Sequence, residues 1–195
     1  MADWQQQVQK IAQEMTDVPQ ILEEEIPDID LYMDQLTTYL EKRLDFFQRD
    51  EKTPLITGTM VNNYSKAGLV HASNRKRYSK LHVMTLSLVC QLKRLLSIQD
   101  MGRLAAPLET EEDLDEVYQL FLLRQKEQFA QTPQLAQTLL SRLEESGIEE
   151  QEKAVTALVT QLITGAQRDV LLAERIIDSL APVQPKGKNK RSGND

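Results

Sequence analysis

The chain has 195 residues, of which 41% are hydrophobic, 27% charged and only 5% aromatic, and its formal net charge is −7. This composition fits one ordinary domain, or a small domain with an appendage, and argues against a disordered chain, a collagen and a membrane protein. The single cysteine, Cys90, excludes an internal disulfide and a cysteine-built zinc site, and two histidines make a His-rich metal site improbable. We expect a cytoplasmic protein, because no apolar run approaches the ~20 residues of a bilayer span and the first residues do not resemble a signal peptide.

Proline and glycine fall almost entirely at the boundaries of periodic segments, and little of the chain alternates with period two, so the pattern predicts an all-α protein. A first helix is expected over about 2–16. A second is expected from about 29 to 48, with Asp28 as its N-cap. A short helix follows between an N-cap at Thr57 and a left-handed stop at Gly68. Residues 70–78 then form a short basic excursion.

The second half of the chain continues as helices. Ser79 is expected to cap a helix that runs to about Leu96, and Ser97 with Asp100 has the spacing of a capping box for a short helix. Thr110 is expected to cap the next helix, whose predicted buried side carries Val117, Phe121 and Phe129. Further helices are predicted from Thr132 to Gly147 and over about 149–181. The last has an apolar stripe of Val155, Leu158, Val159, Leu162, Ile163, Val170, Ala173, Ile177 and Leu180.

These elements divide into four parts. We expect an amino-terminal helix and linker over 1–27 and a DNA-binding domain over 28–107. A helical dimerisation or regulatory region covers 108–182, and a basic tail covers 183–195. The tail is too polar to bury anything and is predicted to be disordered.

Charge is distributed unevenly along the chain. Residues 52–103 contain nine basic side chains and a single acid, Asp100, which is a net charge of +8. The rest of the chain has 14 basic and 29 acidic side chains, a net charge of −15. Such a division indicates that one part meets a polyanion while the other keeps the protein soluble or self-associates.

The short helix and the basic excursion after it have the residue types of a DNA interface. Thr59, Asn62, Asn63 and Lys66 share one helical face, and an amide can both donate to and accept from adenine. Met60, Val61 and Tyr64 lie off that face and are predicted to pack beneath it. The basic cluster of Arg75, Lys76 and Arg77 would contact DNA phosphates. The predicted DNA-binding residues are Thr59, Asn62, Asn63, Lys66, Asn74, Arg75, Lys76, Arg77 and Lys80.

This stretch, from about Thr53 to Leu104, resembles the amino-terminal domain of MerR-type transcription regulators. Those proteins have a second helix of the form S-x-x-T-L-R-Y-Y-E-x-x-G-L, a wing with R-x-Y-S and a closing S-L-x-x-I-x-x-L. Here Thr57 takes the place of the capping Ser, Tyr64 that of the second Tyr, and Gly68-Leu69 that of the Gly-Leu pair. The R-x-Y-S corresponds to residues 76–79, and the closing motif to Ser97-Ile98 with Met101 and Leu104. The chain departs from the pattern at Asn62, where those regulators have Arg, and in a shorter wing.

A closer resemblance, over roughly residues 26–105, is to domain-of-unknown-function family 1836, a bacterial family found mostly in Firmicutes. It rests on L-Y-M-D-Q (31–35), M-V-N-N-Y-S-K (60–66), R-Y-S-K (77–80) and L-S-I-Q-D (96–100), in this order. The resemblance implies a MerR-like winged helix-turn-helix and a role in transcription regulation. It also implies that helix 29–48 is the first helix of the DNA-binding unit.

Two functions therefore stand as hypotheses. The first is a sequence-specific DNA-binding transcription regulator, with helix 58–67 in the major groove of double-stranded DNA and loop 71–78 on the backbone. It would act as a homodimer through helices 110–181. The second is a helical adaptor whose basic surface docks on an acidic protein partner. No Walker, G-x-G-x-x-G, H-E-x-x-H or G-x-S-x-G motif occurs, so we expect no enzyme and no cofactor.

Overall fold

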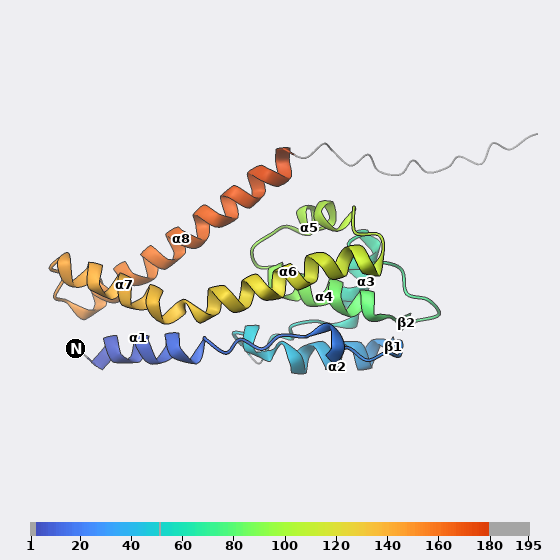
Figure 1. The fold of residues 1–195 in the computed structure, drawn as a ribbon, viewed down its shortest axis with the longest axis horizontal. Coiled ribbons are helices and arrows are strands. Elements are labelled where there is room, and N and C mark those ends of the chain that lie inside the picture. Colours follow the sequence, from blue (N-terminus) through green and yellow to red (C-terminus); the bar gives the residue numbers. More distant parts are fainter. Residues whose placement is uncertain (1–2, 51, 180–195) are drawn as a thin grey trace, which may run out of the picture.

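The computed structural model describes residues 3–50 and 52–179, and over these residues the protein is mainly helical, as predicted (Figure 1). The helices are α1 (Asp3–Glu14), α2 (Met33–Arg43), α3 (Gly58–Lys66), α4 (Lys80–Leu92), α5 (Ile98–Ala105), α6 (Glu111–Ala130), α7 (Thr132–Glu145) and α8 (Gln151–Ser179). Two 3₁₀ turns, η1 (Glu23–Glu25) and η2 (Asp45–Phe47), flank α2. Two short strands, β1 (Leu31–Tyr32) and β2 (Arg77–Tyr78), pair antiparallel, with Leu31 opposite Tyr78.

The main core lies around α4 and is formed by residues between Ile21 and Leu122. α4 has the most apolar sequence of the helices around it, and its side chains Met84 and Leu86 are completely buried. Tyr118 of α6 is also fully buried, and its hydroxyl donates to the carbonyl of Ile21 at 2.8 Å and lies 3.2 Å from Ser87 Oγ. One core thus unites the segment before α2 with α4 and α6.

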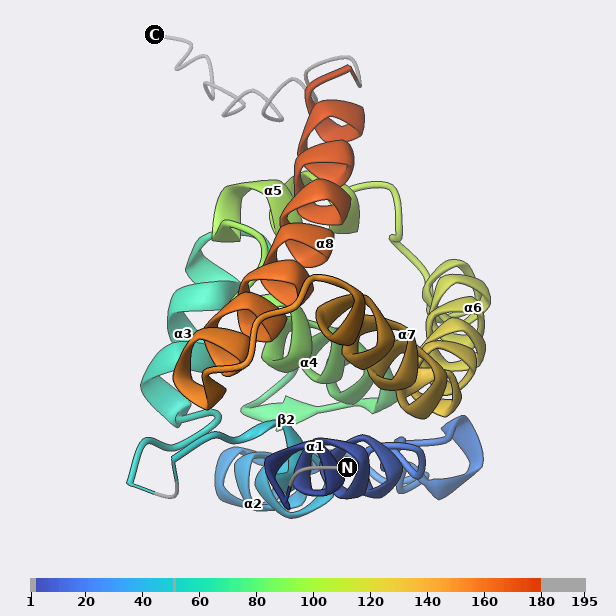
Figure 2. The same cartoon turned by 90° about the vertical axis from the view of Figure 1, so that its left-hand side faces the viewer.

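A second, smaller core joins the two ends of the described chain. Leu139, Leu140 and Leu143 of α7 and Leu158 of α8 are buried together, and Trp4 and Val8 of α1 pack against them. Figure 2 shows α1 beneath α7 at this end of the molecule. A hydrogen bond of 2.6 Å from Gln9 Nε2 to Gln137 Oε1 adds a polar contact. The amino-terminal helix is therefore packed on the carboxy-terminal helices.

The predicted caps at the ends of α3, α5 and α6 are confirmed. The N–H of Met60 donates to Thr57 Oγ1, and Gly68 has a φ of +75° at the end of α3. Ser97 accepts from the N–H of Asp100 at 3.1 Å. Thr110 caps α6, and its own N–H donates to Asp113, which completes a capping box.

The predicted start of α2 is wrong. The helix begins at Met33, with Tyr32 as N-cap, rather than at 29 after Asp28. Leu31 and Tyr32 are held extended because they pair with β2, and the side chain of Gln35 accepts from the N–H of Tyr32 at 2.9 Å. The helix ends at Arg43 instead of 48, and η2 follows it.

The predicted face of α6 is also partly wrong. Its buried residues are Leu114, Tyr118 and Leu122, whereas Val117 is exposed and Phe121 is half-buried. The stripe on α8 is present, but much of it is uncovered. Leu158 and Ile177 are buried near the two ends, and between them Ile163 is 63% exposed. α8 therefore packs on α7 at its start and on α5 near its end (Figure 1). Leu180 and the basic tail lie outside the described residues.

Cys90 is buried in the main core, where it packs as a small hydrophobic side chain. Burial raises the pKa of its thiol to about 12. The thiol is consequently protonated at neutral pH and is a poor nucleophile.

Candidate nucleic-acid interface

The reading face predicted for α3 is exposed to solvent. Val61 and Tyr64 are buried in the main core and Met60 packs against it, which fixes the rotation of the helix. The opposite side therefore carries only polar side chains, and all four predicted ones are exposed, namely Thr59, Asn62, Asn63 and Lys66. A helix of nine residues is ~13 Å long, a length that suits the width of a major groove.

The basic excursion after α3 is a tight hairpin. The N–H of Asn74 donates to the carbonyl of Arg77 at 3.2 Å, and the N–H of Arg77 returns a bond of 2.9 Å. The two residues between them, Arg75 and Lys76, have φ of +51° and +63°. Positive φ at both central positions is the property of a type I′ turn, which favours Asn and Gly there. This hairpin instead places two long cations at its tip.

Arg77 is held by an aromatic side chain that the sequence analysis did not select. Its Nη2 donates to the hydroxyl of Tyr32 at 3.2 Å, and its guanidinium carbon lies 5.2 Å from the centre of the Tyr32 ring. Tyr32 pairs with Arg77 across the β1–β2 ladder, so the backbone sets this contact. The L-Y-M-D-Q motif contains this tyrosine, but its partner lies 45 residues away in the chain.

Not every cation of the basic segment is available to a ligand. Lys80 forms an ion pair with Glu23, and Lys93 donates to the carbonyl of Leu55. Arg103 lies 3.7 Å from Asp100 and 3.3 Å from Asp178. By contrast, Lys66, Arg75 and Lys76 are exposed and form no ion pair within residues 3–50 and 52–179. The sequence count of +8 thus overstates the charge that a partner would meet.

His82 fixes the base of the hairpin to α4. The N–H of Ser79 donates to its Nδ1 at 3.0 Å, and its ring lies edge-on to Tyr78, with the ring centres 5.3 Å apart. The buried Nε2 has no hydrogen-bond partner in the part of the chain that the structure describes. Burial lowers the pKa of this imidazole below 6.5, an effect that the backbone of His71 opposes.

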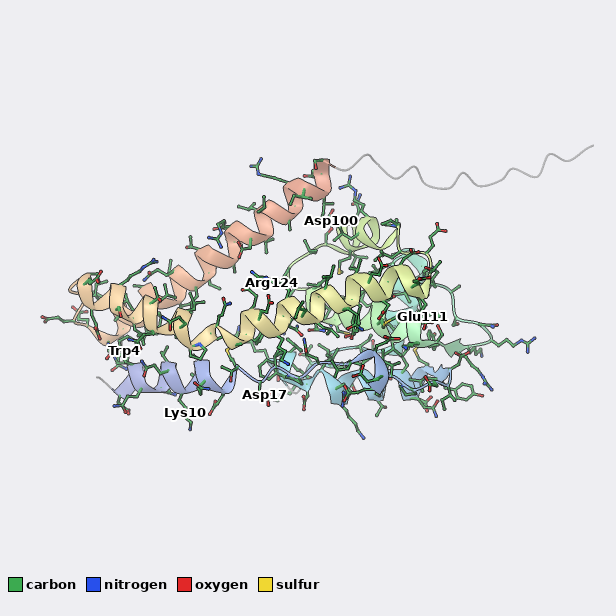
Figure 3. All side chains as sticks on the ribbon, viewed as in Figure 1. Trp4, Lys10, Asp17, Asp100, Glu111 and Arg124 are labelled. Atoms are coloured by element: carbon green, nitrogen blue, oxygen red, sulfur yellow. The ribbon has the colours of Figure 1, made fainter. Side chains whose placement is uncertain are left out.

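α3 and the hairpin lie at the same end of the molecule, opposite the packing of α1 on α7 (Figure 1). Nitrogen-tipped side chains project from the loop before β2, beyond the labelled Glu111 (Figure 3). Of the nine predicted residues, only Lys80 forms an ion pair with another described residue, and Arg77 is positioned by Tyr32.

Two other kinds of site find no support in the described ranges. No cluster of three or more His, Cys, Asp or Glu side chains has a metal-binding arrangement there. No helix among residues 3–50 and 52–179 has the length and apolarity to cross a membrane.

Comparison with known families gives one match. A family described as a domain of unknown function (DUF1836) matches residues 21–121, just over half of the chain. The match begins at the first residue of the main core and ends one residue before the last, Leu122. No curated protein and no solved structure matches the chain.

Proposed function

The chain belongs to the DUF1836 family, and from its own surface we propose that it is a sequence-specific DNA-binding transcription regulator. In this proposal α2 and α3 form a helix-turn-helix, and the hairpin closed by Asn74 and Arg77, whose second strand β2 pairs with β1, is a MerR-like wing. The observation that carries the proposal is the polar face of α3 beside a strained hairpin tipped by Arg75 and Lys76.

α3 would enter the major groove with its exposed face toward the bases. Asn62 and Asn63 would bond base edges, since an amide matches the donor and acceptor of adenine. Lys66, at the end of the face, would contact a phosphate. Val61 and Tyr64 anchor the helix to the core, so the polar side chains are presented from a rigid support.

The hairpin would hold the DNA backbone next to that groove. Arg75 and Lys76 are exposed and have no ion pair within the described residues, so no internal salt bridge competes with a phosphate. Arg77 is oriented by Tyr32, which reduces the entropy lost when it binds. Phosphate contacts of this kind position the protein without reading sequence.

We further propose that two copies pair through α6 and α8. Leu120 is 67% and Ile163 is 63% exposed, and further large apolar side chains are exposed on the same two helices. Exposed apolar surface is typical of protein–protein interaction sites where such side chains lie together. A two-fold dimer would present two copies of α3 to half-sites one helical turn apart.

The dimer is tested by light scattering after gel filtration. We expect the wild-type chain at twice its monomer mass and Ile163→Glu at the monomer mass. Thr138→Glu adds the same charge at an exposed polar position of α7, outside the proposed interface, so it should remain dimeric. A monomeric wild-type protein would contradict the dimer.

DNA binding is tested by fluorescence anisotropy with random duplex DNA over a range of salt. If about six phosphates are neutralised per dimer, log K against log salt should have a slope near −5. Arg75→Ala should weaken binding to all sequences alike and flatten the slope by about one unit. Asn63→Ala should relax the choice of sequence at one base pair, by ~1–3 kcal/mol.

A matched variant separates the site from general charge. Arg75, Lys76 and Arg77 changed together to alanine should abolish binding. Lys10, Arg49 and Arg142 changed to alanine remove three exposed charges elsewhere and should bind as the wild type does. A response to salt that is flat, or equal losses in both triple variants, would refute the proposal. Loss of oligomerisation in the hairpin variant would favour the protein adaptor instead.

A further inference from the structure

A half-open cavity of about 730 Å³ lies between α4, α5 and α6. Each helix contributes apolar walls to it. Leu88 and Leu92 come from α4, Met101 and Leu104 from α5, and Val117 and Phe121 from α6. Pockets of 300–1,000 Å³ with such walls enclose molecules of drug size.

The shape of the cavity favours a small molecule over a partner helix. Residues 106–109, which lie in the connection from α5 to α6, line it as well. The segment from Gly68 to His71, which connects α3 to the hairpin, lines it too. A helix is ~10 Å wide and needs a trough that is open at both ends. This cavity is only half-open, and residues of two loops complete the lining that the helices begin.

The lining also restricts the charge of a ligand. Among the described residues no Lys or Arg lines the cavity, and the ionisable residues of its lining are His71 and Glu109, which are both exposed at the surface. A charged ligand would lose its hydration among mainly apolar walls, and an anion would meet no Lys or Arg in that lining. Thr85 Oγ1 donates to the carbonyl of Leu81 at 2.8 Å, which leaves its lone pairs free to accept from a ligand hydroxyl or amine.

We propose that this cavity is a binding site for an uncharged, largely apolar small molecule with at most one or two hydrogen-bond donors. α5 forms one wall of the site. It is short, and it is held by the last turns of α8, where Ile177 is buried and Asp178 meets Arg103.

Two fluorescent probes that differ by one charged group test the proposal. N-phenyl-1-naphthylamine is uncharged, and 1-anilinonaphthalene-8-sulfonate has the same rings with a sulfonate. The full chain should bind the uncharged probe with one site per chain and a blue-shifted emission. It should bind the sulfonate at least tenfold more weakly. Equal affinities, or no binding of the uncharged probe, would overturn the proposal.

A pair of variants locates the site. Val117 of α6 lines the cavity and Leu135 of α7 does not, although both are exposed apolar side chains. Val117→Trp should fill the cavity and weaken the uncharged probe at least tenfold, whereas Leu135→Trp should leave its affinity within twofold. Both should keep wild-type helicity by circular dichroism. If Leu135→Trp also loses the probe, or Val117→Trp keeps it, the site is elsewhere and the proposal is wrong. No DNA is used, so this failure is distinct from failure of the DNA-binding proposal.

Discussion

Single residues at the hairpin tip combine backbone strain with exposed charge. A left-handed conformation costs an L-residue other than glycine ~1–2 kcal/mol, and Arg75 and Lys76 both adopt it. Glycine would relieve that strain but would carry no cation. Strain that persists at an exposed position is a sign of function. The hairpin tip therefore has cations, which the proposed phosphate contact requires, rather than the residues that the turn prefers.

This trade-off is testable at one position. Lys76→Gly should raise the free energy of unfolding by ~1 kcal/mol, because glycine adopts positive φ without steric conflict. The same variant should weaken DNA binding, because a phosphate contact is lost. Lys76→Ala is the control, since it removes the charge and keeps the strain. In urea denaturation, we expect the glycine variant to have a higher free energy of unfolding than the alanine variant. In fluorescence anisotropy, we expect the two variants to bind DNA equally weakly. If Lys76→Gly were less stable than the wild type, the positive φ at this position would not be a source of strain.

A second residue, His82, should make stability depend on pH. Its pKa in the folded protein is lowered, first of all by burial, so the unfolded chain takes up the proton more readily. The stabilising effect of the neutral ring is fully present above pH ~6.5, the pKa of an unperturbed histidine, and is lost as pH falls through the folded pKa. Protonation would also turn Nδ1 from the acceptor of the Ser79 N–H into a donor.

We expect His82→Gln to remove part of the stability loss between pH 7.5 and 5.5 in thermal denaturation. Glutamine at the third position of α4 can still accept from the Ser79 N–H, so the helix cap is kept. His71 is unchanged in this variant, so the difference between the two pH profiles reports on His82. A profile in the His82 variant identical to that of the wild type would exclude this histidine as the cause.

Between elements, the hydroxyl of Tyr118 ties α6 to α4 and to the segment before α2. Tyr118→Phe should lower the free energy of unfolding by ~1–2 kcal/mol, because it leaves the buried carbonyl of Ile21 without its donor. Tyr39 provides a control, since its hydroxyl donates to the carbonyl of Glu25 at 3.0 Å in an exposed position. Tyr39→Phe should cost clearly less in urea denaturation. Equal losses would mean that burial of the bond is unimportant.

Helix caps could be predicted from local sequence, whereas helix ends that depend on distant segments could not. The caps at Thr57, Ser97 and Thr110 were predictable because each depends on residues within three positions. The start of α2 was not, because Tyr32 is kept out of the helix by a strand 45 residues later. Two-residue strands have no periodicity to detect. The contact between Tyr32 and Arg77 was missed for the same reason.

Helix faces follow the same distinction. The buried side of α3 was predicted, because Val61 and Tyr64 stand out among polar neighbours. On α6, apolar residues occur all round the helix, so the pattern could not distinguish Val117 from Tyr118. Several apolar side chains of α6 and α8 stay exposed, because a single chain has no further helix to cover them. These exposed side chains are the physical reason to propose that a second copy of the chain packs on them.

In the whole molecule, the proposed ligand cavity lies between the proposed DNA-reading end and the uncovered helices. Its rim includes Gly68 and Leu69, where α3 ends and the hairpin begins. The N–H of Leu69 donates to the carbonyl of Tyr64 at 3.0 Å, so this rim is continuous with the last turn of α3. A ligand that contacts the rim would stabilise the present placement of α3 against the hairpin.

Binding of the ligand and of DNA should therefore be coupled, if both proposals hold. Saturation with N-phenyl-1-naphthylamine should tighten DNA binding about fivefold or more, because the interface is ordered in advance. Linkage requires that DNA tighten the probe by the same factor, which a titration in the presence of duplex measures. Val117→Trp should bind DNA yet show no response to the probe. If the probe binds the wild-type chain and leaves the DNA affinity unchanged, the cavity and the DNA-reading end are independent.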